Sequence, residues 1–161
     1  MGVHTLVSGG QTGADRAAFD VGLQHGLRVR GWVPQGRWAE DGPVPERYPN
    51  LIETESRDPA ERTARNVRDS EGTLLLSHGP LFGGSLLTAK KASEIGRPLL
   101  HLDLDRLSLD QALQQLRPWL AEQGIQSLNI AGPRASDDPA IYDATHRLLE
   151  ALFAAVRPRL G

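Results

Sequence analysis

Short apolar segments alternate with helix-forming segments along the whole chain, and this order constrains the fold more than any other feature. The apolar segments are predicted to be strands at residues 3–8, 28–33, 72–77, 98–103 and 126–131. Helices are predicted at residues 12–25, 58–70, 84–95, 108–123 and 138–156. Strands that alternate with helices usually pair in parallel, so the sequence predicts an α/β fold with a mostly parallel sheet and helices on both of its faces.

Capping residues support several of these helix boundaries. Asp58 stands directly before a proline, and Ser108 forms a capping-box pattern with Gln111. Pro118 lies inside the fourth predicted helix, where it removes a backbone hydrogen bond. We therefore expect this helix to be kinked or split near Arg117.

Composition limits the class of protein. With 161 residues the chain fits a single domain, residues 1–161. Its 18 basic and 20 acidic residues give a net charge of −2, so no overall field attracts nucleic acid or an anionic membrane. The chain has no cysteine and no apolar run long enough to span a bilayer, so we expect a cytoplasmic protein without thiolate metal sites or disulfides. Its five histidines are not spaced as metal ligands, and no protein-bound metal is predicted.

The segment at residues 34–57 departs from the regular order, with four prolines and little periodicity. Long segments of this kind inside a domain are often functional, although a plain surface excursion is the alternative. Glu40 and Asp41 lie within it and are candidates for general acid–base catalysis or metal binding. A solvated turn before Gly42 would explain both carboxylates equally well.

Glycine-rich sequences follow most of the predicted strands, where an α/β sheet binds its ligands. Glycine lets the backbone approach a ligand closely, and free amides at a helix start attract anions. Two such glycine corners are residues 9–13 and 83–85. We therefore predict an anion-binding site at the carboxyl edge of the sheet, with plain strand–helix packing as the alternative. The candidate ligand-binding residues are Ser8, Gly9, Gly10, Gln11, Thr12, Gly13, Arg16, Gly36, Arg37, Gly83, Gly84, Ser85 and Arg134.

Other polar and aromatic residues near these corners leave alternatives open. Asp15 is either a first-turn acid that favours the helix dipole or a group that faces the ligand. Arg62, Arg65 and Asp69 share one helical face and are expected to form a surface ion-pair set. Trp38 could stack on a flat heterocycle together with Trp32, which as a strand residue is expected in the core.

Familiar nucleotide-binding and hydrolase motifs do not match this chain. The first glycine corner lacks the Lys-Ser/Thr pair of a P-loop and the spacing of G-x-G-x-x-G. No Gly-x-Ser-x-Gly elbow is present, and no nucleophile stands out. The sequence therefore favours a binding protein over an enzyme with a covalent intermediate.

Five separated motifs resemble, in order and spacing, the family known as "putative molybdenum carrier". These motifs are SGGQTGADRAAFD, GWVPQGRWAEDGPVPERYP, ERTARNVRDSEGTLLLS, GPLFGGSLLT and LNIAGPRASDDPAIYDAT. The resemblance implies a three-layer Rossmann-like fold, related to lonely-guy phosphoribohydrolases once named lysine decarboxylases, and a homo-oligomer, either a dimer or a tetramer. It also implies molybdenum cofactor (molybdopterin) or molybdate as the bound ligand, with a molybdoenzyme as recipient. The phosphoribohydrolase glutamate is missing, because Ala89, Lys90 and Lys91 occupy its region.

Three functional hypotheses follow. The first is a non-catalytic carrier that binds an anionic, phosphate-bearing or nucleotide-like ligand at the glycine corners. The second is a hydrolase or transferase acting on a nucleotide or nucleoside phosphate, with Glu40 or Asp41 activating water. The third is a sensor that passes ligand binding on to a partner protein.

Overall fold

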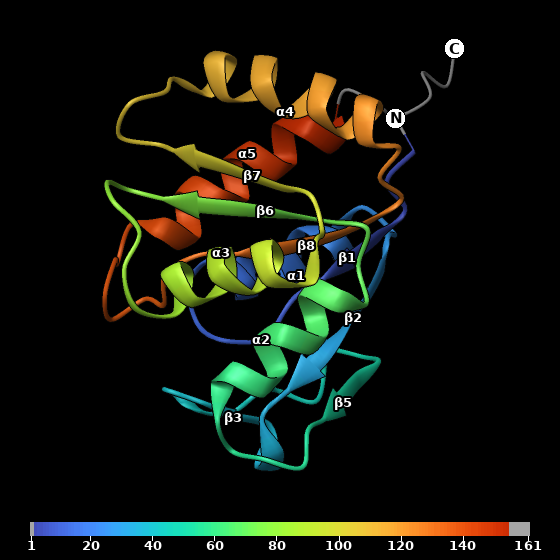
Figure 1. Cartoon of the computed structure of the whole chain (residues 1–161), viewed down its shortest axis with the longest axis vertical. Helices are drawn as coiled ribbons and strands as arrows, with labels where there is room; N and C mark the ends of the chain where they lie inside the picture. The colour runs from blue at the N-terminus through green and yellow to red at the C-terminus, as the bar shows by residue number, and fades with distance from the viewer. Residues whose placement is uncertain (1, 155–161) are drawn as a thin grey trace.

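A parallel sheet of six strands runs through the computed structural model, which describes residues 2–154 (Figure 1). Each strand pairs in parallel with its neighbours. From one edge to the other the strands are β5 (Leu51–Glu53), β2 (Arg28–Val33), β1 (Thr5–Val7), β8 (Ser127–Ala131), β6 (Gly72–Ser77) and β7 (Leu99–Asp103). A short antiparallel pair, β3 (Trp38–Ala39) and β4 (Gly42–Pro43), lies beside this sheet.

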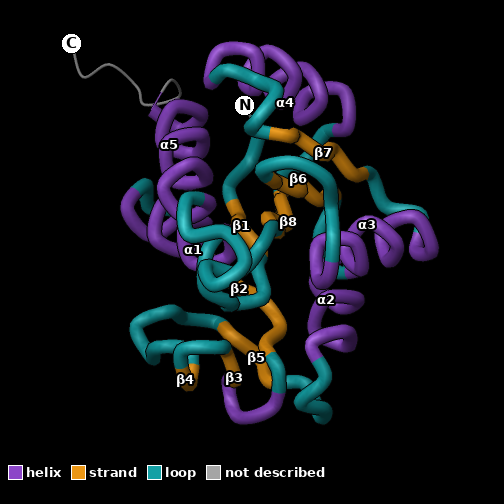
Figure 2. The backbone as a smooth tube through the Cα atoms, turned by 90° about the vertical axis from the view of Figure 1, so that its left-hand side faces the viewer, coloured by secondary structure: helices purple, strands orange, loops and turns teal. Residues whose placement is uncertain are grey.

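Helices cover both faces of the sheet, as Figure 2 shows. On one face α1 (Ala14–Gln24) packs against α5 (Ile141–Ala154), which also contacts α4 (Leu109–Gln123). On the other face α2 (Pro59–Arg68) packs against α3 (Gly83–Ile95). A 3-10 turn, η1 (Gln35–Arg37), follows β2. The predicted three-layer, Rossmann-like α/β fold is confirmed.

Two apolar clusters form the core. The larger one joins the central strands to α1, α4 and α5, and all six residues of β6 are buried within the sheet. The smaller one joins Phe19 of α1 to Val33 of β2 and to Tyr48 in the 34–57 segment. The second cluster therefore fixes the proline-rich segment against the sheet.

The structure corrects two expectations about local elements. The 34–57 segment, for which the sequence predicted no regular element, contains η1, β3, β4 and the edge strand β5. The helix that contains Pro118 runs unbroken from Leu109 to Gln123. Pro118 and the residue four positions before it, Gln114, are both exposed, so water can reach the carbonyl that has lost its donor. Residues 155 and 156 of the last predicted helix lie outside the described residues.

Within residues 2–154, no helix has both the length and the hydropathy needed to cross a bilayer.

Candidate functional site

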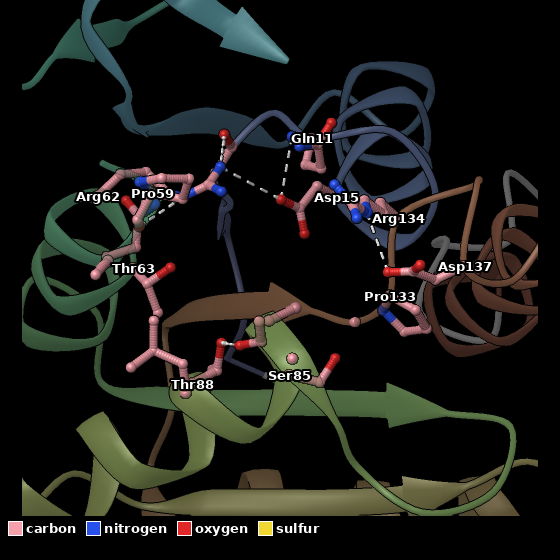
Figure 3. Close-up of a pocket in the computed structure, with 18 of the residues that line it drawn as sticks. Gln11, Asp15, Pro59, Arg62, Thr63, Ser85, Thr88, Pro133, Arg134 and Asp137 are labelled. Carbon is pink, nitrogen blue, oxygen red and sulfur yellow. Dashed lines mark hydrogen bonds and ion pairs between the residues drawn. The ribbon is translucent and has the colours of Figure 1, made fainter. Parts of the chain in front are cut away.

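A cavity of about 420 Å³ opens at the carboxyl ends of β1 and β8, between the N-termini of α2 and α3 (Figure 3). Its walls come from four segments that are far apart in the sequence: the β1–α1 corner, the start of α2, the start of α3, and the loop after β8. This is the sheet edge where parallel α/β folds hold their ligands. The volume lies within the range of small-molecule sites.

The start of α3 presents unpaired donors to the cavity. The amide groups of Gly83 and Gly84 donate no hydrogen bond to any described residue, because they lie in the first turn of α3, where no helical carbonyl stands four residues before them. Ser85 is buried, with 7% of its surface exposed, and its hydroxyl has no hydrogen-bond partner among the described residues. These three groups stand at the positive end of the helix dipole, where an anion is stabilised.

Asp15 and Arg62 form a buried pair on the opposite wall (Figure 3). Asp15 Oδ2 accepts a hydrogen bond from the Gln11 amide at 3.1 Å and lies 4.0 Å from Arg62 Nη1. Arg62 also donates to the carbonyls of Gly9 and Pro59. Burial raises the pKa of Asp15 to about 6, although the Arg62 charge lowers it.

Gly9 is required at this corner by the position of Arg62. A Cβ at Gly9 would lie 2.6 Å from Arg62 Cδ and Nη1. Any larger residue would therefore displace the guanidinium from the carbonyl to which it donates.

The floor and rim of the cavity add an amide and two aromatic side chains. Asn129 of β8 is 3% exposed and donates to Thr73 Oγ1 at 3.2 Å. Trp38 and Phe82 line the cavity and are 43% and 54% exposed. Their exposed faces could contact a flat ring.

The structure brings six of the candidate ligand-binding residues to the cavity wall. They are Gly9, Gln11, Gly83, Gly84, Ser85 and Arg134. Arg134 donates to Asp137 at 3.0 Å and lies 3.5 Å from Glu40, so its charge is already partly balanced.

Four other candidates from the first glycine corner support the backbone around the cavity. Ser8 donates to the Ile130 carbonyl at 2.8 Å. Gly10 and Gly13 have φ values of 76° and 81°, which favour glycine. Thr12 donates to Glu40 at 2.8 Å and accepts from the Ala135 amide at 3.0 Å.

Three further candidates, Arg16, Gly36 and Arg37, do not line the cavity. Arg16 forms a two-point pair with Asp41 at 2.9 and 3.0 Å. Arg37 donates to the Val44 and Pro45 carbonyls, and the Gly36 amide donates to Glu53. In this structure their hydrogen bonds hold the 34–57 segment in place.

Glu40 and Asp41, the two candidate catalytic carboxylates, also lie outside the cavity lining. Glu40 accepts hydrogen bonds from the Thr12 hydroxyl and from the amide and hydroxyl of Ser136. Burial raises the pKa of Glu40, but the bonds from Ser136 and Thr12 outweigh it and hold the pKa below its ordinary value. The hydrogen bond from Arg16 lowers the pKa of Asp41. Both carboxylates are therefore ionised at neutral pH and already paired.

The expected surface ion-pair set on α2 is wrong for Arg62, which is buried at the cavity. Arg65 does pair with Glu61, and its guanidinium lies over the Trp32 ring at 4.6 Å. Trp32 does not line the cavity. The sequence did hold a signal for Arg62, since it lies in the first turn of a helix that begins at the carboxyl edge of the sheet.

A second, smaller cavity of about 250 Å³ adjoins the first and shares four lining residues with it: Phe82, Ser85, Pro133 and Asp137. On its wall, His78 Nδ1 lies 2.6 Å from Asp138 Oδ2. Within residues 2–154 no three His, Asp or Glu side chains gather as a metal site would require.

Comparisons with known proteins agree with this architecture. The family model described as "Circularly permutated YpsA SLOG family" matches residues 6–153. A crystal structure from Syntrophus aciditrophicus SB, described as a "putative molybdenum carrier protein", superposes with a TM-score of 0.91 and is 52% identical in sequence. The match covers 92% of this chain and 94% of that one. No curated protein matches the chain.

Proposed function

The chain belongs to the circularly permutated YpsA SLOG family, and from this premise we propose that it is a non-catalytic binding protein whose cavity holds a phosphate-bearing anionic ligand. The observation that carries the proposal is the set of unpaired donors at the start of α3: the Gly83 amide, the Gly84 amide and the Ser85 hydroxyl. Three unpaired donors at one helix N-terminus suit the oxygens of a phosphate or molybdate.

Each carboxylate of the cavity has a partner within the protein, which limits its effect on a bound anion. Asp58 caps α2 by accepting from the Ala60 amide at 3.0 Å. Asp137 pairs with Arg134, and Asp15 lies beside Arg62. The donors of α3 are thus left to bind an added anion.

Among anionic ligands, we propose molybdenum cofactor first, with a nucleotide-like molecule or the oxyanion molybdate as alternatives. The name of the 52% identical structure supports this choice. Delivery to a molybdoenzyme, assembly as a dimer or tetramer, and residence in the cytoplasm belong to the same proposal.

Calorimetric titration with inorganic phosphate, molybdate, a pterin phosphate and nucleoside monophosphates tests the proposal. Gly84→Pro removes one amide donor in the first turn of α3, where proline is tolerated. Gly84→Ala adds a Cβ at the same place and keeps the amide, and no heavy atom lies within 4 Å of that Cβ. We expect Gly84→Pro to bind the anion about tenfold more weakly than Gly84→Ala does, because the proline variant loses one charge-assisted hydrogen bond to the anion. Equal affinities, or no binding of any of these anions to the native protein, would contradict the proposal.

A second candidate function is a hydrolase or transferase acting on nucleotides or nucleoside phosphates, and Asp15 favours it. One Asp15 oxygen faces the cavity, and with a pKa of about 6 the carboxylate could accept a proton from water. Turnover of a nucleotide panel that disappears in Asp15→Asn would support this function. A complete lack of turnover by the native protein would exclude it for that panel.

A further inference from the structure

We propose that Asp15 and Arg62 recognise the edge of an aromatic ring that carries adjacent N–H donors next to a carbonyl acceptor. The 2-amino-4-oxo edge, which guanine and pterin share, has this pattern. The inference rests on the proposed binding function, and it identifies the ligand class and the residues that select it.

Asp15 provides a fixed acceptor. Its Oδ2 is held by the Gln11 amide, and the Ser8 hydroxyl also lies near the carboxylate, where it lowers the pKa of Asp15. Ser8 donates its hydroxyl hydrogen to the Ile130 carbonyl, so Oδ1 can still accept from a ligand. Figure 3 shows this second oxygen directed into the cavity. Asp15 is 8% exposed, so a ligand group in the cavity is the natural donor to this oxygen.

Arg62 provides a donor beside that acceptor. Its Nε and Nη1 donate to backbone carbonyls, and Nη2 has no hydrogen bond to any described residue. Among the described residues, Thr145 Oγ1 is the one side-chain polar atom that is both fully enclosed and without a partner. Nη2 also lacks a partner, so it must keep some accessible surface, and Arg62 lines the cavity. A ring N–H can therefore donate to Asp15 while its carbonyl accepts from Arg62.

The rim and the far wall fit the rest of such a molecule. Trp38 and Phe82 offer exposed aromatic faces against which a ring can stack. In Figure 3 Ser85 lies across the cavity from Asp15, on the wall formed by the start of α3. A ring at Asp15 and a phosphate at α3 can therefore be bound together.

The pattern also excludes other rings. Adenine presents a ring-nitrogen acceptor and an amino group on the corresponding edge, so its acceptor would face the Asp15 carboxylate. A ring with a second carbonyl in place of the 2-amino group would leave one donor fewer for Asp15. A buried polar group of Asp15 or of the ligand that is left without a partner costs more free energy than its hydrogen bond would have gained.

Matched ligands that differ by one amino group provide the test. Calorimetry should compare GMP with IMP, which lacks the 2-amino group, and a pterin phosphate with the lumazine phosphate that carries a carbonyl in its place. Within each pair that binds, we expect the compound with the 2-amino group to bind the native protein at least about tenfold more tightly than the compound without it. The two pairs also distinguish a guanine nucleotide from a pterin as the better ligand.

Asp15→Asn should reduce this ratio to within about twofold, while inorganic phosphate still binds. Asp110→Asn is the matched control, since Asp110 is an exposed first-turn acid of α4 away from the cavity. Equal affinity within both pairs for the native protein would overturn the inference, whether or not Asp15→Asn folds. Failure of every anion to bind would instead overturn the proposed function.

Discussion

Asp15 Oδ2 and Arg62 Nη1 lie 4.0 Å apart, and the two side chains join α1 to α2 across one wall of the cavity. Burial outweighs the arginine's charge, so the pKa of Asp15 rises to about 6. The charge of the cavity therefore changes within a pH range in which the protein can be studied.

Ligand binding should depend on pH through Asp15. The charged groups that act on it are Arg62 from α2 and Arg16 from its own helix. As the pH falls through about 6, Asp15 gains a proton and the cavity loses a negative charge, so sulfate, which remains a dianion, should bind more tightly. Calorimetry between about pH 5 and 8 measures this change. A sulfate affinity with the same pH profile in Asp15→Asn as in the native protein would show that another group is responsible.

Glu40 should contribute to stability rather than to catalysis. Glu40→Gln cannot accept all the bonds from Thr12 and Ser136, and we expect it to lower the free energy of unfolding by about 1–2 kcal/mol. Asp41→Asn removes a pair whose carboxylate is 49% exposed, so its cost should be below about 1 kcal/mol. Urea denaturation at pH 7 compares the two variants.

The effect of Glu40 should also depend on pH. Because its folded pKa lies below the ordinary value of 4.5, its stabilisation is present above pH 4.5 and is lost as the pH falls through the folded pKa. The difference between Glu40→Gln and the native protein should therefore shrink in acid. A constant difference would mean that the charge of Glu40 plays no part.

The sequence predicted the central elements because their signals are local. β6 is apolar throughout, and the Asp58 and Ser108 caps are both found in the structure. β5 was missed because it is three residues long and is defined by its pairing with β2, where Gly31 faces Leu51. Local periodicity cannot report such a pairing.

The sequence predicted the part of the candidate site that follows from the order of strands and helices along the chain. Glycine-rich strand ends meet at one edge of a parallel sheet, and Gly9 and Gly84 do line the same cavity. Arg62 was assigned to the surface because helical periodicity shows which residues share a face, but not what covers that face. Its partners, Gly9 and Asp15, come from the β1–α1 corner, which is far from α2 in the sequence.

Gly13 should be needed for the fold. It has φ 81° and ψ −128°, and a Cβ there would lie 2.4 Å from the Pro133 carbonyl oxygen. Gly36 has a similar φ of 80° with nothing within 4 Å of its Cβ position. We expect Gly36→Ala to cost about 1–2 kcal/mol and Gly13→Ala more than about 3 kcal/mol, measured by urea denaturation. Equal losses in the free energy of unfolding would mean that the loop after β8 can shift to make room for the Cβ.

Tyr48 should hold the 34–57 segment on the sheet. It is 2% exposed, its ring contacts Phe19, and its hydroxyl donates to Asp20 at 2.6 Å. Tyr48→Phe should lower the free energy of unfolding by about 1–2 kcal/mol, since Asp20 keeps its bond from Tyr142. Tyr48→Ala also removes the ring from the smaller core cluster and should cost about 3–5 kcal/mol.

Hydrogen exchange can show where Tyr48 acts. The Val44 amide donates to the Arg37 carbonyl at 2.7 Å, and this bond closes the part of the segment that carries Trp38. In Tyr48→Ala this amide should exchange faster than expected from the loss of global stability, because the segment can then open on its own. Tyr142→Phe is the control, since it removes one bond to Asp20 from the α5 side and leaves Tyr48 in place. If Val44 exchanged only through global unfolding in both variants, the segment would be part of the main cooperative unit, and Trp38 would remain in position at the cavity without Tyr48.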